Sequence, residues 1–311
     1  MRRTYTFHSE RPGKTAGMAA VYARRLAAGA ILAAFLFAPL ALHSSPRIDI
    51  SEAAFTDITF STAEYTLDTR ALDFTEDGSR FYIVGRSSGN VVEYELSSPW
   101  DIESAEYVGE FNFTDDFETR AQGYNAAHGV NIHPDGTYLH VWNRVELWQY
   151  ELETPWEVTS AAHVGYNDLS EIATRGHDIA FTPDGTTMFL DDRDDQMVYQ
   201  FALDTPWDIE TASLVYELDI SDEEDAVRGT EFSVDGMQMF LMDTGRREVL
   251  QYDLEEAWQI ESSEFAGSFN VTLQSRNPRG LSLRPDGSGM YVVDANSDEV
   301  LYYEFPVDDA E

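Results

Sequence analysis

An Asp-Gly dipeptide recurs along the chain at nearly constant spacing. It occupies positions 77–78, 135–136, 184–185, 235–236 and 286–287, at intervals of 58, 49, 51 and 51 residues. Each pair separates two runs in which apolar and polar residues alternate, which is typical of a β-hairpin. A second marker recurs out of phase, as SPWD at 98–101, TPWE at 154–157, TPWD at 205–208 and EAWQ at 256–259. A repeat of about 50 residues therefore governs the fold of most of the chain.

Each repeat unit predicts four short strands. In the third unit the expected strands cover 177–182, 187–191, 198–203 and 213–220, and the other units follow the same pattern. Tandem units of four antiparallel strands are typical of β-propeller blades. The sequence thus predicts an all-β fold, a five-bladed β-propeller of four-stranded blades that forms a single domain over residues 46–311. A sixth blade is excluded because residues 46–60 are too few for one.

The last unit lacks a fourth strand of its own after the run 300–305. The segment 61–68, STAEYTLD, is similar to ESAEYVGE at 103–110, the expected fourth strand of the first unit. We therefore expect this N-terminal strand to complete the last blade. Closure of the ring removes exposed sheet edges, and it takes the place of disulfides in a chain without cysteine.

The repeats resemble the PD40- and YVTN-type propeller units of bacterial proteins, in which an SPDG hairpin follows the innermost strand. The TPWDI marker at 205–209 is similar to a marker of secreted bacterial and phage propellers of largely unknown function. The resemblance covers nearly all of residues 61–305. It implies a propeller with a ligand site at the mouth of its central channel. It implies little about activity, because one propeller architecture hosts many functions.

The N-terminal segment has the composition of a targeting sequence. Residues 1–45 hold six of the chain's 20 basic residues and one of its 57 acidic residues, and an apolar run over 26–42 precedes a Ser-Ser-Pro stretch. This order predicts a secretory signal and export to the periplasm or the extracellular space, with a retained N-terminal anchor as the alternative. A start at Met18 gives a signal of more usual length.

The rest of the chain is strongly acidic. Residues 46–311 hold 14 arginines and 56 acidic residues, a formal net charge of −42. This charge excludes nucleic acid as a partner and favours a soluble monomer, and we expect no membrane contact beyond an N-terminal anchor. Because salt screens the self-repulsion, a saline, halophilic setting is expected. The absence of cysteine excludes thiol catalysis and Cys-ligated metal centres.

One residue per repeat, near the start of the innermost strand, is an arginine or a histidine. These five positions are Arg70, His128, His177, Arg228 and Arg279. The residues at the ends of the second strands are Gly85, Asn143, Asp192, Asp243 and Asp294. The resemblance implies that both sets lie near the channel mouth.

Three interpretations of these sets stay open. In the first, each blade holds one structural charge-assisted pair. The pairs are His177 with Asp192, Arg228 with Asp243, Arg279 with Asp294, and His128 with Asn143. In the second, the groups converge on a carboxylate, a phosphate or a sugar acid, because Arg70 faces Gly85 and lacks a carboxylate across from it. In the third, the three aspartates ligate Ca²⁺, and no other cofactor is expected.

Other residues add candidates around this mouth. The longest connection, 113–127, carries Phe117, Arg120 and Tyr124, which are placed to cover a ligand. His133 and His140 stand outside the repeat pattern and are expected to be structural. The tryptophans of the second marker are expected to pack between blades on the opposite face. They are Trp100, Trp156, Trp207 and Trp258.

The sequence carries no nucleophile elbow, zinc-protease helix, phosphate loop or dinucleotide fingerprint. Together with the near-symmetric mouth, this favours a non-enzymatic exported binding protein. Its expected ligand is an anionic small molecule, a carbohydrate or a cell-envelope component. The alternative is a hydrolase or lactonase, with or without a metal, that uses Asp192 or Asp294 as base and His177 or His128 as acid/base. A third hypothesis is a domain of a larger secreted assembly.

Overall fold

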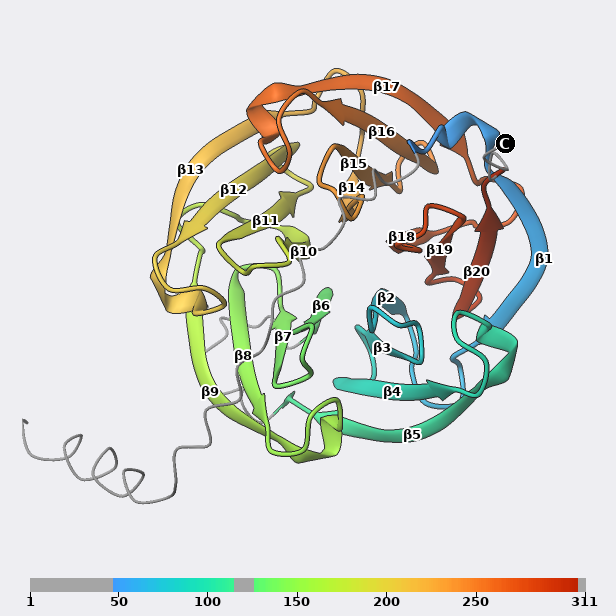
Figure 1. Cartoon of the computed structure of the whole chain (residues 1–311), viewed down its shortest axis with the longest axis vertical. Coiled ribbons are helices and arrows are strands. Elements are labelled where there is room, and N and C mark those ends of the chain that lie inside the picture. The colour runs from blue at the N-terminus through green and yellow to red at the C-terminus, as the bar shows by residue number, and fades with distance from the viewer. Residues whose placement is uncertain (1–46, 115–125, 307–311) are drawn as a thin grey trace, which may run out of the picture. The chain divides into compact units, whose positions relative to one another are not determined.

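The computed structural model describes residues 47–114 and 126–306, which form five four-stranded antiparallel sheets arranged as a ring (Figure 1). This confirms the five-bladed β-propeller that the repeats predict. Within these residues, no helix is both long and apolar enough to cross a membrane.

Each blade takes its strands in chain order from the channel outward. Blade 1 contains β2 (Thr69–Phe74), β3 (Arg80–Gly85), β4 (Asn90–Leu96) and β5 (Ala105–Asn112). Blade 2 contains β6 (Gly129–Ile132), β7 (Tyr138–Trp142), β8 (Glu146–Leu152) and β9 (Ala161–Asp168). Blade 3 contains β10 (Gly176–Phe181), β11 (Thr187–Asp192), β12 (Met197–Leu203) and β13 (Ala212–Asp219). Blade 4 contains β14 (Val227–Phe232), β15 (Gln238–Asp243), β16 (Glu248–Leu254) and β17 (Ser263–Asn270).

Blade 5 is completed from the other end of the chain. Its strands β18 (Pro278–Leu283), β19 (Gly289–Asp294) and β20 (Glu299–Glu304) are followed in the sheet by β1 (Ala54–Ser61), which pairs antiparallel with β20. Closure by an N-terminal strand is therefore confirmed, and Figure 1 shows the blue β1 beside the red β20.

The position of the closing strand within the chain was predicted wrongly. The strand is Ala54–Ser61, whereas residues 62–68 form a turn in which Thr66 N–H donates to the carbonyl of Thr62 (2.9 Å). The valid repeat signal is the pair Asp49-Ile50, because Asp49 caps a short 3₁₀ turn ahead of β1 just as Asp101 does ahead of β5. The prediction rested on the sequence similarity between 61–68 and 103–110 and did not take this cap into account.

Adjacent blades share the hydrophobic core. Between blades 1 and 2, for example, Tyr82 and Val84 of β3 pack in one buried cluster with Leu139 and Val141 of β7. The innermost strands contact one another in sequence around the ring, and the last contact joins β18 to β2. Burial between blades thus fixes the five innermost strands around a common axis.

Four of the five Asp-Gly hairpins are each covered by the tryptophan of their own repeat. Gly185 has a φ of +68°, which an L side chain rarely adopts, and a Cβ there would lie 2.2 Å from Trp207. The Trp207 ring also stacks on Phe181, with centroids 5.2 Å apart, and lies 4.3 Å from the ring of His133 in blade 2. This confirms packing of the marker tryptophans at the hairpin face.

Candidate functional site

The five arginine and histidine positions are equivalent in the structure. Four of them lie at or next to a register shift in an innermost strand: between Thr69 and Ala71, Gly176 and Ile179, Val227 and Thr230, and Pro278 and Leu281. His128 directly precedes β6. A β-bulge redirects side chains relative to the regular pleat. We call these five side chains the axial ring: Arg70, His128, His177, Arg228 and Arg279.

Charges from four blades meet at this ring. The pKa of Arg228 in blade 4 falls to about 9, first because of burial and then because of four other arginines. These are Arg193, Arg70, Arg175 and Arg144. They belong to blades 1, 2 and 3, so their charges reach Arg228 together only near the axis. Residues 46–311 hold four acidic residues for every arginine, and the domain nevertheless gathers five of its 14 arginines here.

The two histidines of the ring are neutral and lie against each other. His128 and His177 are each 2% exposed, and their rings meet edge to face with centroids 4.9 Å apart. Burial lowers the pKa of each well below its ordinary value. The neighbouring imidazole lowers the pKa of His128 further, and Arg228 does the same for His177. Both imidazoles are therefore uncharged at neutral pH.

Hydrogen bonds define the tautomer of each ring. The Nδ1 of His177 lies 2.8 Å from the carbonyl oxygen of Arg175, which only accepts, so Nδ1 carries the hydrogen. In His128, Nε2 accepts a hydrogen bond from Nε of Arg144 (2.9 Å), so its hydrogen is on Nδ1. His177 thus presents a lone pair at Nε2, and His128 presents an N–H at Nδ1.

Several buried atoms of the axial ring have no partner among the described residues. The donors are Nε of Arg70, Arg228 and Arg279, Nη1 of Arg279 and Nδ1 of His128, and the acceptor is Nε2 of His177. Buried polar groups are nearly always hydrogen-bonded in proteins. A concentration of unpartnered donors at one place indicates that a ligand or water completes the set.

Arg70 does have a carboxylate partner, contrary to expectation. Its Nη2 lies 2.6 Å from Oδ2 of Asp68, in the turn just before β2. The expectation compared Arg70 only with Gly85, the residue across from it in the repeat, and overlooked a residue two positions away. Burial still lowers the pKa of Arg70, although the ion pair with Asp68 opposes that effect.

The predicted pairing of the axial-ring residues with the residues at the ends of the second strands is wrong. Asp192 accepts backbone N–H groups from Thr174 and Arg175 before β10 and from Asp194 and Asp195 after β11, at 2.7 to 3.1 Å. Each of these carboxylates therefore joins the loop before its innermost strand to the turn after its second strand. Within the described ranges, none of the ion pairs joins an axial-ring residue to one of these aspartates.

Blades 4 and 5 use the same device, whereas Asn143 of blade 2 bonds within the turn after β7. Asp243 accepts N–H groups from residues 225, 226, 245 and 246, and Asp294 accepts them from 277, 296 and 297. Asn143 accepts from the N–H of Glu146 (2.8 Å) and donates to its carboxylate (3.0 Å). The oxygens proposed for Ca²⁺ are thus occupied by amides. The residues described in the structure contain no group of three ligating side chains placed to hold a metal ion.

The three loop candidates lie outside the part of the chain that the structure describes. Phe117, Arg120 and Tyr124 fall in the range 115–125. His133 and His140 both pack against Trp207 at the hairpin face. His133 pairs with Asp135 in its own hairpin (2.6 Å), and burial against Phe181 lowers the pKa of His140 to about 3.

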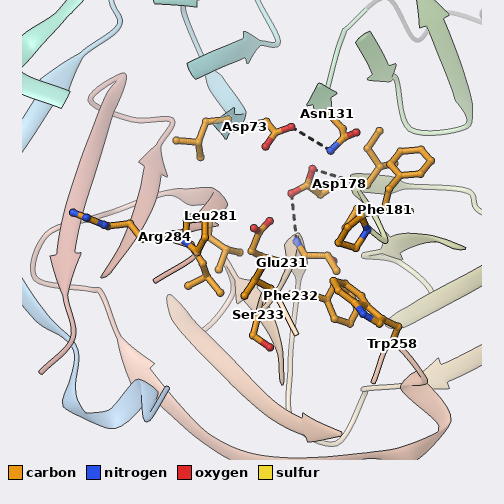
Figure 2. Close-up of a pocket in the computed structure, with 18 of the residues that line it drawn as sticks. Asp73, Asn131, Asp178, Phe181, Glu231, Phe232, Ser233, Trp258, Leu281 and Arg284 are labelled. Carbon is orange, nitrogen blue, oxygen red and sulfur yellow. Dashed lines mark hydrogen bonds between the residues drawn. The ribbon is translucent and has the colours of Figure 1, made fainter. Parts of the chain in front are cut away.

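A second feature of the channel was missed by the sequence analysis. A cavity of about 170 Å³ opens nearer the hairpin end of the innermost strands, and Asp73, Asp178 and Glu231 line it (Figure 2). Burial raises the pKa of Asp73 to about 7 and raises that of the other two carboxyls. Asp73 accepts the N–H of Ile132 in the next blade (2.7 Å), which gives it a structural role. Asp73 lies three residues after Arg70 of the axial ring, and this position in the repeat was the signal that could have identified it.

Similarity to known proteins is found among solved structures. No family model matches the chain, and no curated protein matches its sequence. A functionally unknown protein of Desulfotomaculum acetoxidans matches with a TM-score of 0.45 and 15% identity over 73% of this chain and 63% of its own. A Lactobacillus plantarum protein matches with a TM-score of 0.49 and 13% identity over 76% and 67%. The periplasmic gluconolactonase of Pseudomonas aeruginosa matches with a TM-score of 0.46 and 16% identity over 75% and 65%.

Proposed function

We propose that this propeller binds a small anion at the axial ring and that it is a binding protein rather than an enzyme. The observation that carries the proposal is the set of unpartnered, buried N–H donors on Arg70, Arg228, Arg279 and His128. Guanidinium groups present donors in a planar fork that suits carboxylates and phosphates.

The electrostatics of the ring support an anion in particular. The depressed pKa of Arg228 means that the folded protein holds this guanidinium at a cost in free energy. A bound anion offsets the repulsion among the arginines and supplies acceptors for the free N–H groups. Water supplies acceptors too, but it does not offset the charge. The neutral histidines keep the ring from becoming still more positive.

A hydrolase or lactonase remains the second candidate function, and one residue favours it. His177 offers an unpartnered Nε2 beside arginines, as a general base next to an anionic substrate does. The aspartates assigned to this reaction, Asp192 and Asp294, accept several backbone N–H groups each, which leaves them poorly suited to proton transfer. We therefore propose binding, and not hydrolysis, as the function of this site.

The setting of this binding function follows from composition. Residues 1–45 act as an export signal, which places the propeller in the periplasm or outside the cell. The repeats belong with the PD40- and YVTN-like units of secreted bacterial propellers. The net charge of −42 over residues 46–311 suits a monomer that works in a saline medium. A carbohydrate or envelope component that carries acidic groups fits the same ring.

The test is thermal unfolding of residues 46–311 with acetate or phosphate against sodium chloride at equal ionic strength. An anion at ten times its Kd stabilises the fold by about 1.4 kcal/mol, or roughly 3 °C in Tm. Arg228→Met should abolish this gain. The matched control, Arg47→Gln, removes one charge from an exposed ion pair with Asp253 and should keep it. Equal responses of the two variants, or no anion-specific gain in the parent protein, would refute the proposal.

A further inference from the structure

We propose that the anion bound at the axial ring carries its own hydroxyl group, as a 2-hydroxycarboxylate does, and that this hydroxyl donates a hydrogen bond to Nε2 of His177. The inference rests on the proposed function, because it names the chemical class of ligand for the same site. It follows from one acceptor that stands among donors.

The acceptor is defined by the hydrogen bond on the other side of the imidazole. Nδ1 of His177 donates to the carbonyl of Arg175 (2.8 Å), so the neutral ring has its lone pair at Nε2. That atom is buried and has no partner among the described residues, and the whole residue is 2% exposed. The strand therefore holds a fixed, desolvated acceptor.

The groups around His177 are of the opposite kind. The arginines whose charges depress its pKa are Arg228, Arg144 and Arg70, and the adjacent ring of His128 has its hydrogen on Nδ1. Every other unpartnered atom of the axial ring is a donor. A simple anion such as acetate satisfies donors only, and it leaves the His177 lone pair buried without a partner.

A 2-hydroxycarboxylate matches both kinds of group in one small molecule. Its carboxylate oxygens accept from the guanidinium groups, and its adjacent hydroxyl donates to Nε2. Sites built to hydrogen-bond a hydroxyl discriminate strongly against analogues that lack it, because the analogue leaves a buried polar group unpaired. We expect a preference of about tenfold for the hydroxyl form, which is the usual effect of one such group.

The test compares glycolate with methoxyacetate. Methoxyacetate keeps the carboxylate and the oxygen on the adjacent carbon, but that oxygen is an ether and carries no hydrogen. Isothermal titration of residues 46–311 should give about tenfold tighter binding of glycolate. In His177→Phe, glycolate should weaken to the level of methoxyacetate, whose affinity stays unchanged. His177→Gln restores an acceptor and should keep part of the preference. His163→Phe, on the exposed outer strand β9, is the matched control and should behave as the parent protein.

Each outcome decides a different point. Equal affinities for the two anions in the parent protein would overturn this inference and leave the proposed function standing, whereas binding of neither would overturn both. A preference that survives in His177→Phe would remove His177 from the recognition. If that variant fails to fold, the ¹⁵N shift of His177 Nε2 in the parent protein decides. It should move on addition of glycolate and not of methoxyacetate, and an unchanged shift would overturn the inference.

Discussion

His128 and His177 lie in adjacent blades, and their imidazole rings meet edge to face with centroids 4.9 Å apart. Burial, followed by the charges of nearby arginines, lowers the pKa of both rings and keeps them in the neutral form. Two uncharged imidazoles at the centre of a basic cluster are a property of the assembled ring, since no single blade contains both residues.

The first prediction concerns the protonation of this pair. Because burial lowers the pKa of both rings well below the ordinary value, neither should titrate near pH 6.5 in ¹H–¹⁵N spectra of the folded protein. In the unfolded chain each should titrate near the ordinary value of about 6.5. A depressed histidine pKa stabilises the fold above the unfolded pKa, and this contribution is lost as the pH falls below it. An imidazole of this pair that titrates between pH 6 and 7 when folded contradicts the prediction.

The second prediction is that Arg228 of the axial ring lowers the stability of the fold in the absence of a bound anion. In anion-free, low-salt buffer, Arg228→Met should stabilise residues 46–311 by about 1 kcal/mol or more, because it removes a partly buried charge that other arginines repel. Urea denaturation measures the change. Added sodium chloride should narrow the difference between the variant and the parent protein. Destabilisation in low salt would show that Arg228 is held by a partner within the fold.

The third prediction tests the packing of the hairpin face. Gly185→Ala should destabilise the fold by about 2–4 kcal/mol, since the residue has a φ of +68° and the added methyl group meets the Trp207 ring. The control is Gly267→Ala in β17, where no atom lies within 4 Å of the added Cβ. That variant should remain close to the parent protein in urea denaturation. Similar losses in both variants would argue against a specific role for the tryptophan.

The fourth prediction concerns a buried carboxyl in the loop between β13 and β14. Burial and the nearby Asp243 raise the pKa of Glu224 from 4.5 to about 8. The unfolded chain releases this proton first, so stability falls as the pH rises from about 4.5 to about 8. Glu224→Gln should flatten this part of the stability profile, measured by urea denaturation at several pH values. Asp222→Asn, an exposed change in the same loop, should leave the slope unaltered.

The repeat pattern determined the number of blades, the order of strands and the closure of the ring, because these follow from local periodicity and turn chemistry. It also singled out Arg70, His128, His177, Arg228 and Arg279, since equivalent positions of a repeat occupy equivalent places. The closing strand was predicted seven residues too late, at 61–68 and not at Ala54–Ser61. A short sequence similarity was given more weight than the Asp49 cap.

The partners of these residues were decided only by the tertiary structure. Asp192, Asp243 and Asp294 bind backbone N–H groups of loops, and no pattern of side chains reveals which amides a loop will present. The bulges at the start of the innermost strands break the two-residue alternation on which a sequence-based reading depends. Periodicity fixes which residues are equivalent, whereas hydrogen-bond partners depend on backbone geometry that forms when the blades pack together.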